Sequence, residues 1–171
     1  AIINSSNKDL IVNTDVLVED VHFNDSTMSP KNIGWKAIAA NVSDLNASGL
    51  NQIIGVTVAL ITPPETEWDW VYNVYTGMKE ALDEFGGKII GGDCSKGNQK
   101  ILSITAIGSS GPLRLHRSNA QPGDCLVTTG PHGLSRLGLG LLQSEEICRS
   151  QALPKRLKKE AIQSHQRPLP P

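Results

Sequence analysis

Three aspartates stand at positions where a carboxylate can reach a ligand. Asp15 lies near the end of a β-branched run, Asp44 interrupts an apolar helical stripe, and Asp93 follows two glycines. Alone, each acid equally suits a turn or a cap. Together, three carboxylates from separate elements, with Thr14 adding an oxygen, suit Mg²⁺, which takes oxygen ligands and keeps several waters. The chemistry that uses such a site is phosphoryl transfer, in which metal ions neutralise charge and align the reacting groups.

Familiar phosphate-binding and nucleophile motifs are missing from the sequence. It has no GxxxxGK[ST], no GxGxxG and no GxSxG, so a Walker A loop, a Rossmann or protein-kinase glycine loop and a nucleophile elbow have no support. Three further side chains are candidates for ligand binding: His22 in a polar loop, Tyr75 on a helical stripe and Arg117 in a polar connector. Each of these, taken alone, also suits a packing or surface role.

Hydrophobic periodicity and turn residues predict the elements that must position these side chains. A strand, a helix, a buried strand, a second helix, a short strand and a half-buried strand are expected in that order, which is typical of an α/β (α+β) domain with a mixed sheet. The expected segments are residues 10–17, a helix opened by Ser29-Pro30 and stopped near Gly49, residues 52–61, a helix opened by a capping box at 62–65 and stopped by Gly86-Gly87, residues 88–90, and residues 100–108.

The last third of the chain is too small to fold alone. It offers one predicted strand over 125–129 and two predicted helices over 135–143 and 153–165, which bury too little apolar surface for a core. We therefore expect one domain over 1–113 and the incomplete start of a second over 114–171.

Composition excludes several classes of protein. Of 171 residues, 39% are hydrophobic, which suits a packed core, and the net charge of −1 gives no support to a nucleic-acid or anionic-membrane surface. No stretch approaches the ~20 apolar residues of a membrane span. Cys94, Cys125 and Cys148 lack CxxC spacing, which favours a reducing cytosol over a disulfide framework or a zinc site.

Five segments, in order and at matching spacing, carry a family resemblance. They resemble the TD-x-LVE-x-x-HF, KA-x-A-x-N-x-SD-x-A-x-G, IGGDT, R-S-G-A-x-PGD and TG-x-x-G segments of thiamine-monophosphate kinases. The corresponding residues here are 14–23 (TDVLVEDVHF), 36–49 (KAIAANVSDLNASG), 89–95 (IIGGDCS), 117–124 (RSNAQPGD) and 129–133 (TGPHG).

The resemblance implies a fold and a reaction. It predicts a PurM-like N-terminal domain that forms a homodimer through its sheet, followed by the beginning of a PurM-like C-terminal domain. The implied reaction is the direct, Mg²⁺-assisted transfer of the γ-phosphoryl group of ATP to thiamine phosphate in the cytoplasm. The implied site residues fall into three groups: the metal ligands Asn13, Thr14, Asp15, Asp44 and Asp93; the ATP-binding residues Tyr75, Gly92, Asp93 and Arg117; and the substrate-binding residue His22.

The sequence also departs from the family pattern. Asn13 stands where a Ser or Thr is usual, Cys94 replaces a Thr, and the family's Gly-Asp-Asp and I-D-x-SDG segments lie outside these 171 residues. We therefore expect an incomplete copy of the enzyme. Two alternatives stay open: another PurM-like ATP-using enzyme, of the aminoimidazole ribonucleotide or selenophosphate synthetase type, and a non-catalytic fragment that dimerises and binds nucleotide.

Overall fold

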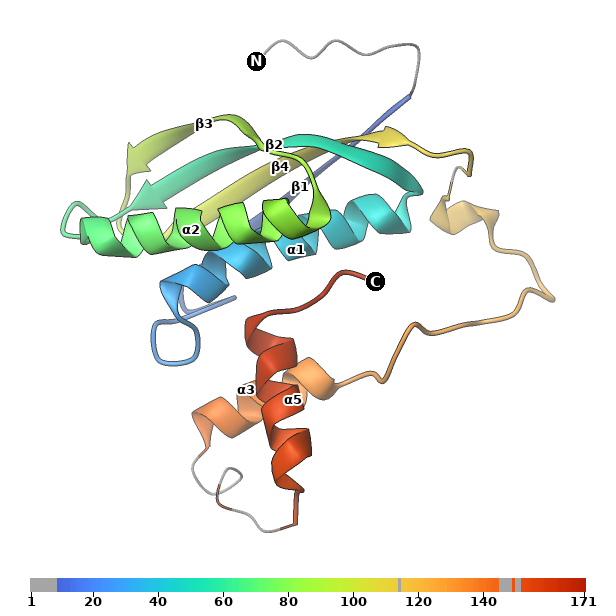
Figure 1. Cartoon of the computed structure of the whole chain (residues 1–171). Coiled ribbons are helices and arrows are strands. Elements are labelled where there is room, and N and C mark those ends of the chain that lie inside the picture. The colour runs from blue at the N-terminus through green and yellow to red at the C-terminus, as the bar shows by residue number, and fades with distance from the viewer. Residues whose placement is uncertain (1–8, 114, 145–148, 150–151) are drawn as a thin grey trace.

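The computed structural model describes residues 9–113, 115–144, 149 and 152–171. Four strands and two long helices form a compact body, and an extended linker between Ser110 and Leu134 joins it to a helical pair. Figure 1 shows this arrangement. The elements are β1 (Leu10–Val18), α1 (Pro30–Ala47), β2 (Leu50–Thr62), α2 (Trp68–Phe85), β3 (Ile89–Lys96), β4 (Ile101–Ser110), a 3₁₀ turn (Arg117–Asn119), α3 (Leu134–Gln143) and α5 (Lys155–Gln166).

The four strands form one mixed sheet in the order β1-β4-β2-β3. β4 runs antiparallel to both of its neighbours, whereas β2 and β3 are parallel. α1 and α2 lie together on one face of this sheet (Figure 1). The predicted mixed sheet with flanking helices is confirmed.

The core lies between the sheet and the two helices because side chains alternate along each strand. On β4, Leu102, Ile104 and Ala106 are buried and face the helices, as their spacing predicts. On α1, the apolar residues that recur every three or four positions are buried against them; these are Trp35, Ile38, Val42 and Leu45. β4 therefore contributes one face to the core, and it lies between β1 and β2 in the sheet.

α1 and α2 approach closely through two glycines. A Cβ on Gly34 would lie 1.9 Å from the Val74 carbonyl oxygen, and one on Gly77 would lie 1.8 Å from the Lys31 carbonyl oxygen. Only glycine permits this crossing, so the sequence has no freedom at either position. Ser29 caps α1 as predicted, since its side chain accepts a hydrogen bond from the backbone N–H of Asn32.

Two features of the second helix and third strand differ from the prediction. α2 begins at Trp68 instead of at the predicted capping box, because Thr62 is the last residue of β2. A turn follows, in which the Thr66 N–H donates to the Pro63 carbonyl. β3 extends through Asp93 to Lys96, since it pairs with β2 along its length. Asp93 therefore lies within a strand and not after one.

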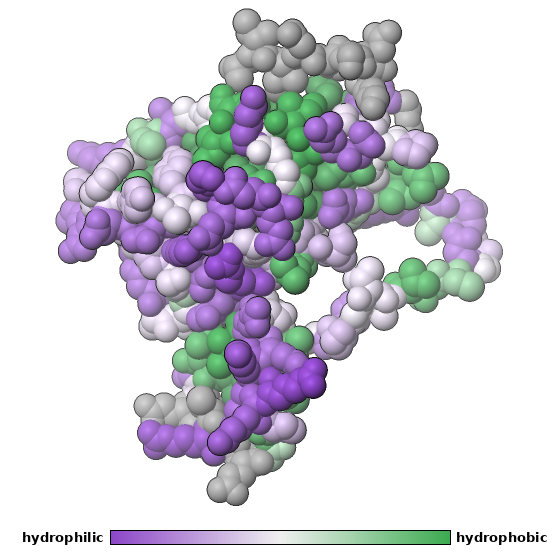
Figure 2. All heavy atoms as spheres, viewed as in Figure 1, coloured by the Kyte–Doolittle hydropathy of each residue, from purple (hydrophilic) through white to green (hydrophobic). Residues whose placement is uncertain are grey.

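The largest difference between the predicted and observed elements lies in the linker. The predicted strand over 125–129 is wrong: this stretch has no strand partner among the described residues, and Leu126 and Val127 are 101% and 90% exposed. Figure 2 shows hydrophobic side chains open to solvent along this linker. Strand propensity alone does not make a strand, because the backbone needs a neighbour to pair with. The two predicted helices beyond it are confirmed as α3 and α5.

A short C-terminal segment ties the helical pair to the body. The Arg167 guanidinium lies over the Trp35 ring at 4.0 Å, and the Trp35 indole N–H donates to the Pro168 carbonyl at 2.8 Å. Asn46 donates to the Pro171 carbonyl at 2.8 Å. Residues 166–171 thus run along α1. Within the part of the chain that the structure describes, no helix is long and apolar enough to cross a membrane.

Candidate functional site

One pocket, which we call the Asp44 pocket, brings together three of the predicted site residues. Asn13, Asp44 and Arg117 line a pocket of about 380 Å³, and the Asn13 amide nitrogen lies 3.2 Å from an Asp44 carboxylate oxygen. Asn13 reaches it because alternate residues of β1 face the helices, and Asp44 reaches it from the last turn of α1. Arg117 arrives from the 3₁₀ turn in the first part of the linker. Residues separated by about a hundred positions therefore meet at one end of α1.

Electrostatics favour a cationic ligand at this end of the helix. A carboxylate in the last turn of a helix faces the negative end of the helix dipole, and α1 has no basic residue in that turn. The side-chain oxygen of Asn13 is buried and has no hydrogen-bond partner among the described residues. An unsatisfied buried oxygen beside a carboxylate is costly unless a ligand completes it. These oxygens fit a hard divalent cation such as Mg²⁺.

The two residues that follow Asn13 point to different sides of β1. Asp15 shares the helix-covered face with Asn13, and its carboxylate accepts the backbone N–H of Val16 at 2.9 Å. Thr14 faces the uncovered side of the sheet, where its hydroxyl lies 2.8 Å from that of Thr105. Neither lines the Asp44 pocket.

A second group of predicted residues lies on and beside β3. Cys94 of β3 lies near Tyr75 of α2, and the pKa of Tyr75 is raised, mainly by burial and further by Cys94. Asp93, one residue earlier, points to the uncovered face, where Ser95 donates to its carboxylate at 2.9 Å. Gly92 is required by close approach, because a Cβ there would lie 2.0 Å from the Val58 carbonyl oxygen. Cys94 and Cys125 are free thiols, and Cys148 lies outside the described residues.

The structure does not gather the three predicted metal acids into one cluster. Asp15 and Asp93 lie on the two edge strands of the sheet, three strand spacings or roughly 14 Å apart. Among residues 9–113, 115–144, 149 and 152–171, no three His, Cys, Asp or Glu side chains are grouped as a metal site. The Asp44 pocket joins two predicted metal residues, Asn13 and Asp44, to Arg117, which is predicted to bind phosphate.

His22 lies in a third place, a small cavity between a loop and the helical pair. This His22 cavity, of about 70 Å³, is lined by loop residues 20–24 and Thr27, by Leu139 and Gln143 of α3, and by His165 of α5. His165 is buried, and its pKa is lowered by that burial and by the charge of Lys36.

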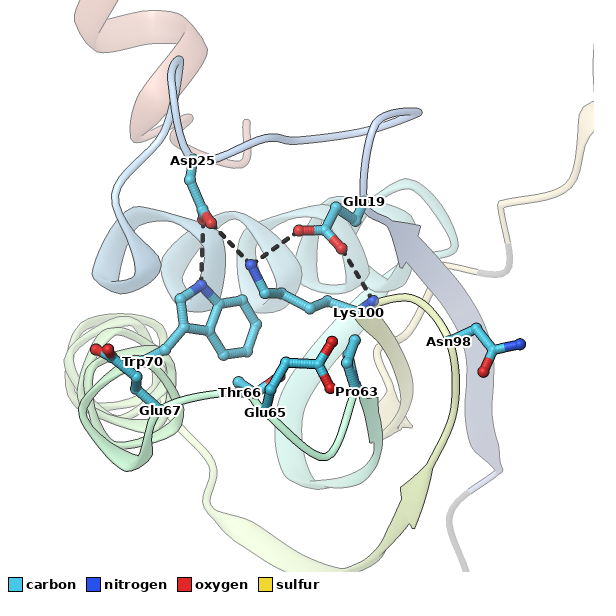
Figure 3. Close-up of a pocket in the computed structure, with 9 residues that line it drawn as sticks. All are labelled: Glu19, Asp25, Pro63, Glu65, Thr66, Glu67, Trp70, Asn98 and Lys100. Atoms are coloured by element: carbon cyan, nitrogen blue, oxygen red, sulfur yellow. Dashed lines mark hydrogen bonds and ion pairs between the residues drawn. The ribbon is translucent and has the colours of Figure 1, made fainter.

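Sequence reasoning missed a pocket of about 490 Å³ at the other end of the sheet (Figure 3). Lys100 pairs there with Glu19 at 2.8 Å and with Asp25 at 2.7 Å, and its ammonium lies 5.0 Å from the centre of the Trp70 ring. Burial alone would lower the pKa of Lys100, but the hydrogen bonds and charges of Asp25 and Glu19 outweigh burial and raise it. The four residues are scattered along the sequence, so no local pattern marked them. Their pairing gives Glu19 of the LVE segment a structural role.

Comparison with known proteins gives one family and a consistent set of relatives. Residues 1–110 match the model of the AIR synthase related protein family, N-terminal domain. The chain is 61% identical over 171 residues to a thiamine-monophosphate kinase of Prochlorococcus marinus and 43% identical over 162 residues to one of Synechococcus elongatus, covering 100% and 94% of this chain and 51% and 48% of those proteins. A structure of AaThiL complexed with AMPPCP and TMP matches 98% of this chain and 52% of its own, with a TM-score of 0.84 and 30% identity. The chain thus spans about half the length of the curated relatives that it matches.

Proposed function

The chain belongs to the family of AIR synthase related proteins, and from that membership we propose that it is part of a thiamine-monophosphate kinase. The resemblance drawn from the five sequence segments is confirmed by the 61% identity to a protein of that name. The proposed reaction transfers the γ-phosphoryl group of ATP directly to thiamine phosphate. The proposed domains are 1–113, which binds ATP and metal, and 114–171, the beginning of a second domain.

The observation that carries the proposal is the Asp44 pocket. Arg117 offers a planar, permanently charged fork that can hold two phosphate oxygens. Asp44 and the unsatisfied oxygen of Asn13 would hold Mg²⁺. Thr14 and Asp15, which do not line this pocket, are proposed as further metal ligands on β1. Bound Mg²⁺ supplies charge neutralisation on the transferred phosphoryl group. The chain's own contribution is then to hold the phosphates of ATP in line with their acceptor.

The other predicted residues have separate roles in this proposal. Tyr75 of α2 and Gly92 and Asp93 of β3 are proposed ATP contacts outside the Asp44 pocket. Gly92 lets the backbone approach, and Asp93 is proposed as a ligand of a further Mg²⁺ ion on the uncovered face. His22 contacts thiamine phosphate from its cavity. AaThiL complexed with AMPPCP and TMP supports the pairing of a nucleotide with a second ligand on this fold.

We further propose that the protein is a cytoplasmic homodimer. The face of the sheet opposite α1 and α2 exposes apolar residues of β1, which are Leu10, Val12 and Val16, at 41%, 58% and 38%. A second copy of the same sheet would cover this face, as isologous dimers commonly do. Free thiols at Cys94 and Cys125 agree with a reducing compartment. Analytical ultracentrifugation of Val12→Lys against the unchanged protein tests the interface, with a monomer expected from the variant.

Activity is tested on the chain and on a version extended by its flanking coding sequence, with thiamine phosphate, ATP and Mg²⁺. We expect thiamine diphosphate from the extended protein, and a loss of about a hundredfold or more in turnover from its Asp44→Asn variant. Asp83→Asn is the matched control, since Asp83 is an exposed acid of α2 that pairs with Lys79 at 2.6 Å, away from the Asp44 pocket. A normal rate for Asp44→Asn at saturating Mg²⁺ would overturn the role of Asp44. Turnover with a different acceptor alone would reassign the protein to another ATP-using enzyme of the superfamily.

A further inference from the structure

Lys36 of α1 is a partly buried cation held by a backbone oxygen. Its ammonium donates to the His22 carbonyl at 2.8 Å. No carboxylate of the described residues lies within ion-pair distance of it, and burial lowers the pKa of this lysine. Buried cations are normally matched by carboxylates, because desolvation is costly. The Lys36 ammonium instead donates to a backbone carbonyl, so this hydrogen bond fixes the position of His22.

His22 is also held at its ring, by the backbone of β1. The Val18 N–H donates to Nδ1 of His22 at 3.1 Å, and the Val18 carbonyl accepts the N–H groups of Val21 and His22. The tight turn that permits this contains Asp20 in the left-handed region, with φ 63°. His22 is thus fixed at its carbonyl by Lys36 and at its ring by Val18.

The contact with Val18 also determines which ring nitrogen carries the proton. A backbone N–H can only donate, so Nδ1 must present its lone pair. The neutral ring then has its hydrogen on Nε2. His22 lines the His22 cavity, and Nε2 has no hydrogen-bond partner among the described residues. This nitrogen is a donor of fixed direction, available to an oxygen of a ligand.

We propose that Lys36 is a positioning residue for His22, and that His22 donates through Nε2–H to an oxygen of the acceptor substrate. The inference rests on the proposed function, in which His22 contacts thiamine phosphate. His165 on α5 and Gln143 on α3 form the facing wall of the cavity, so the helical pair borders the space into which His22 donates. The ammonium of Lys36 orients the loop and does not itself contact the reacting groups.

The first test measures the tautomer in the ligand-free chain and needs no activity. Long-range ¹H–¹⁵N correlation spectra, with His22 assigned by the loss of its signals in His22→Gln, should show a deprotonated Nδ1 and a protonated Nε2 at neutral pH. In Lys36→Met the His22 signals should broaden or shift, whereas in Lys31→Met they should not change, because Lys31 lies on the same helix and pairs with Glu80 at 2.6 Å. A ring protonated on Nδ1, or a Lys36→Met spectrum identical to that of the unchanged chain, would overturn the positioning role.

The second test uses steady-state kinetics of the extended protein. Lys36→Met should raise the KM for thiamine phosphate about tenfold to a hundredfold, the loss expected from a misaligned hydrogen bond to a charged group. The KM for ATP should change less than about twofold, and Lys36→Arg should restore most of the loss, since it also donates to the carbonyl. Equal rises in both KM values would indicate a general structural effect and overturn the inference. If the unchanged extended protein does not phosphorylate thiamine phosphate, the proposed function and the substrate contact fail together, while the spectra still decide the positioning role.

Discussion

The body over residues 9–110 and the segment over 111–171 use similar residues to different effect. The body's core contains 22 buried apolar residues, all between Leu17 and Ala106. In the described part of the later segment, Leu141 and Ala161 are the buried apolar residues. Leu126 and Val127 have the composition of a buried strand and yet are exposed. The difference lies in the available partners and not in the residue types, because burial and pairing need a second surface.

The largest expected effect contrasts one leucine from each region. Leu102→Ala on the central strand should lower the free energy of unfolding by about 2–5 kcal/mol, because it leaves a cavity at a fully buried position. Leu126→Ala should change it by less than about 0.5 kcal/mol, since its side chain has no packing to lose. Urea unfolding followed by tryptophan fluorescence measures both. Equal losses would mean that the linker packs on the body in solution.

The sequence predicted the body well because its signals are local. The alternation around Ile104, the stripe around Ile38 and the cap at Ser29 each act within a few residues, and each element formed where expected. The start of α2 failed because two rules competed, and the turn at Pro63 prevailed over the capping box. The prediction of a strand over 125–129 failed because a strand needs a pairing partner elsewhere in the chain. The sequence of the segment alone does not show whether such a partner is present.

The next contrast concerns the glycines that let helices touch in each region. A Cβ on Gly34 would meet the Val74 carbonyl oxygen at 1.9 Å, and one on Gly138 would meet that of Ala161 at 2.0 Å. Gly34→Ala and Gly138→Ala should each cost about 1–3 kcal/mol through overpacking. Only the first should lower the stability of the body. Hydrogen exchange should accelerate in residues 134–143 and 155–166 for Gly138→Ala, with the sheet unchanged. Faster exchange in the sheet as well would show that the two regions unfold as one unit.

The candidate site was only partly predictable for a related reason. Residue types pointed to Asp44, the family resemblance added Asn13 and the phosphate role of Arg117, and the structure places these three in one pocket. The expected grouping of Asp15 with Asp93 was a statement about distance between strands, which sequence spacing does not contain. The Lys36 contact with the His22 carbonyl could not be predicted either, because every residue has a backbone carbonyl and residue types do not show which one is used.

The C-terminal segment offers a smaller effect, at the junction of the two regions. Arg167→Ala should weaken docking of residues 166–171 on α1 by about 1 kcal/mol, since it removes the cation–π contact with Trp35 and a partly exposed pair with Glu80 at 3.2 Å. The loss should appear as a change in Trp35 emission and faster exchange over α5. Arg156→Ala is the control, because its pair with Glu160 is on the solvent side of α5. A response to Arg156→Ala of the same size would remove the special role of Arg167.

The smallest expected effect is a pH dependence in the docking of α5 that the sheet does not share. Burial, and next the charge of Lys36, lower the pKa of His165 from its ordinary 6.5, while Ser135 and the cavity residues Asp20 and His22 also face it. Below about pH 6.5 the undocked state therefore binds a proton that the docked state does not, so docking of α5 should weaken as pH falls and be fully recovered above that value. Exchange over 155–166 between pH 7.5 and 5.5, corrected for intrinsic rates, measures it, and exchange in the sheet should not follow. His165→Gln should abolish the dependence, whereas His116→Gln in the exposed linker should keep it; a dependence that survives His165→Gln would assign the proton to another group at this junction.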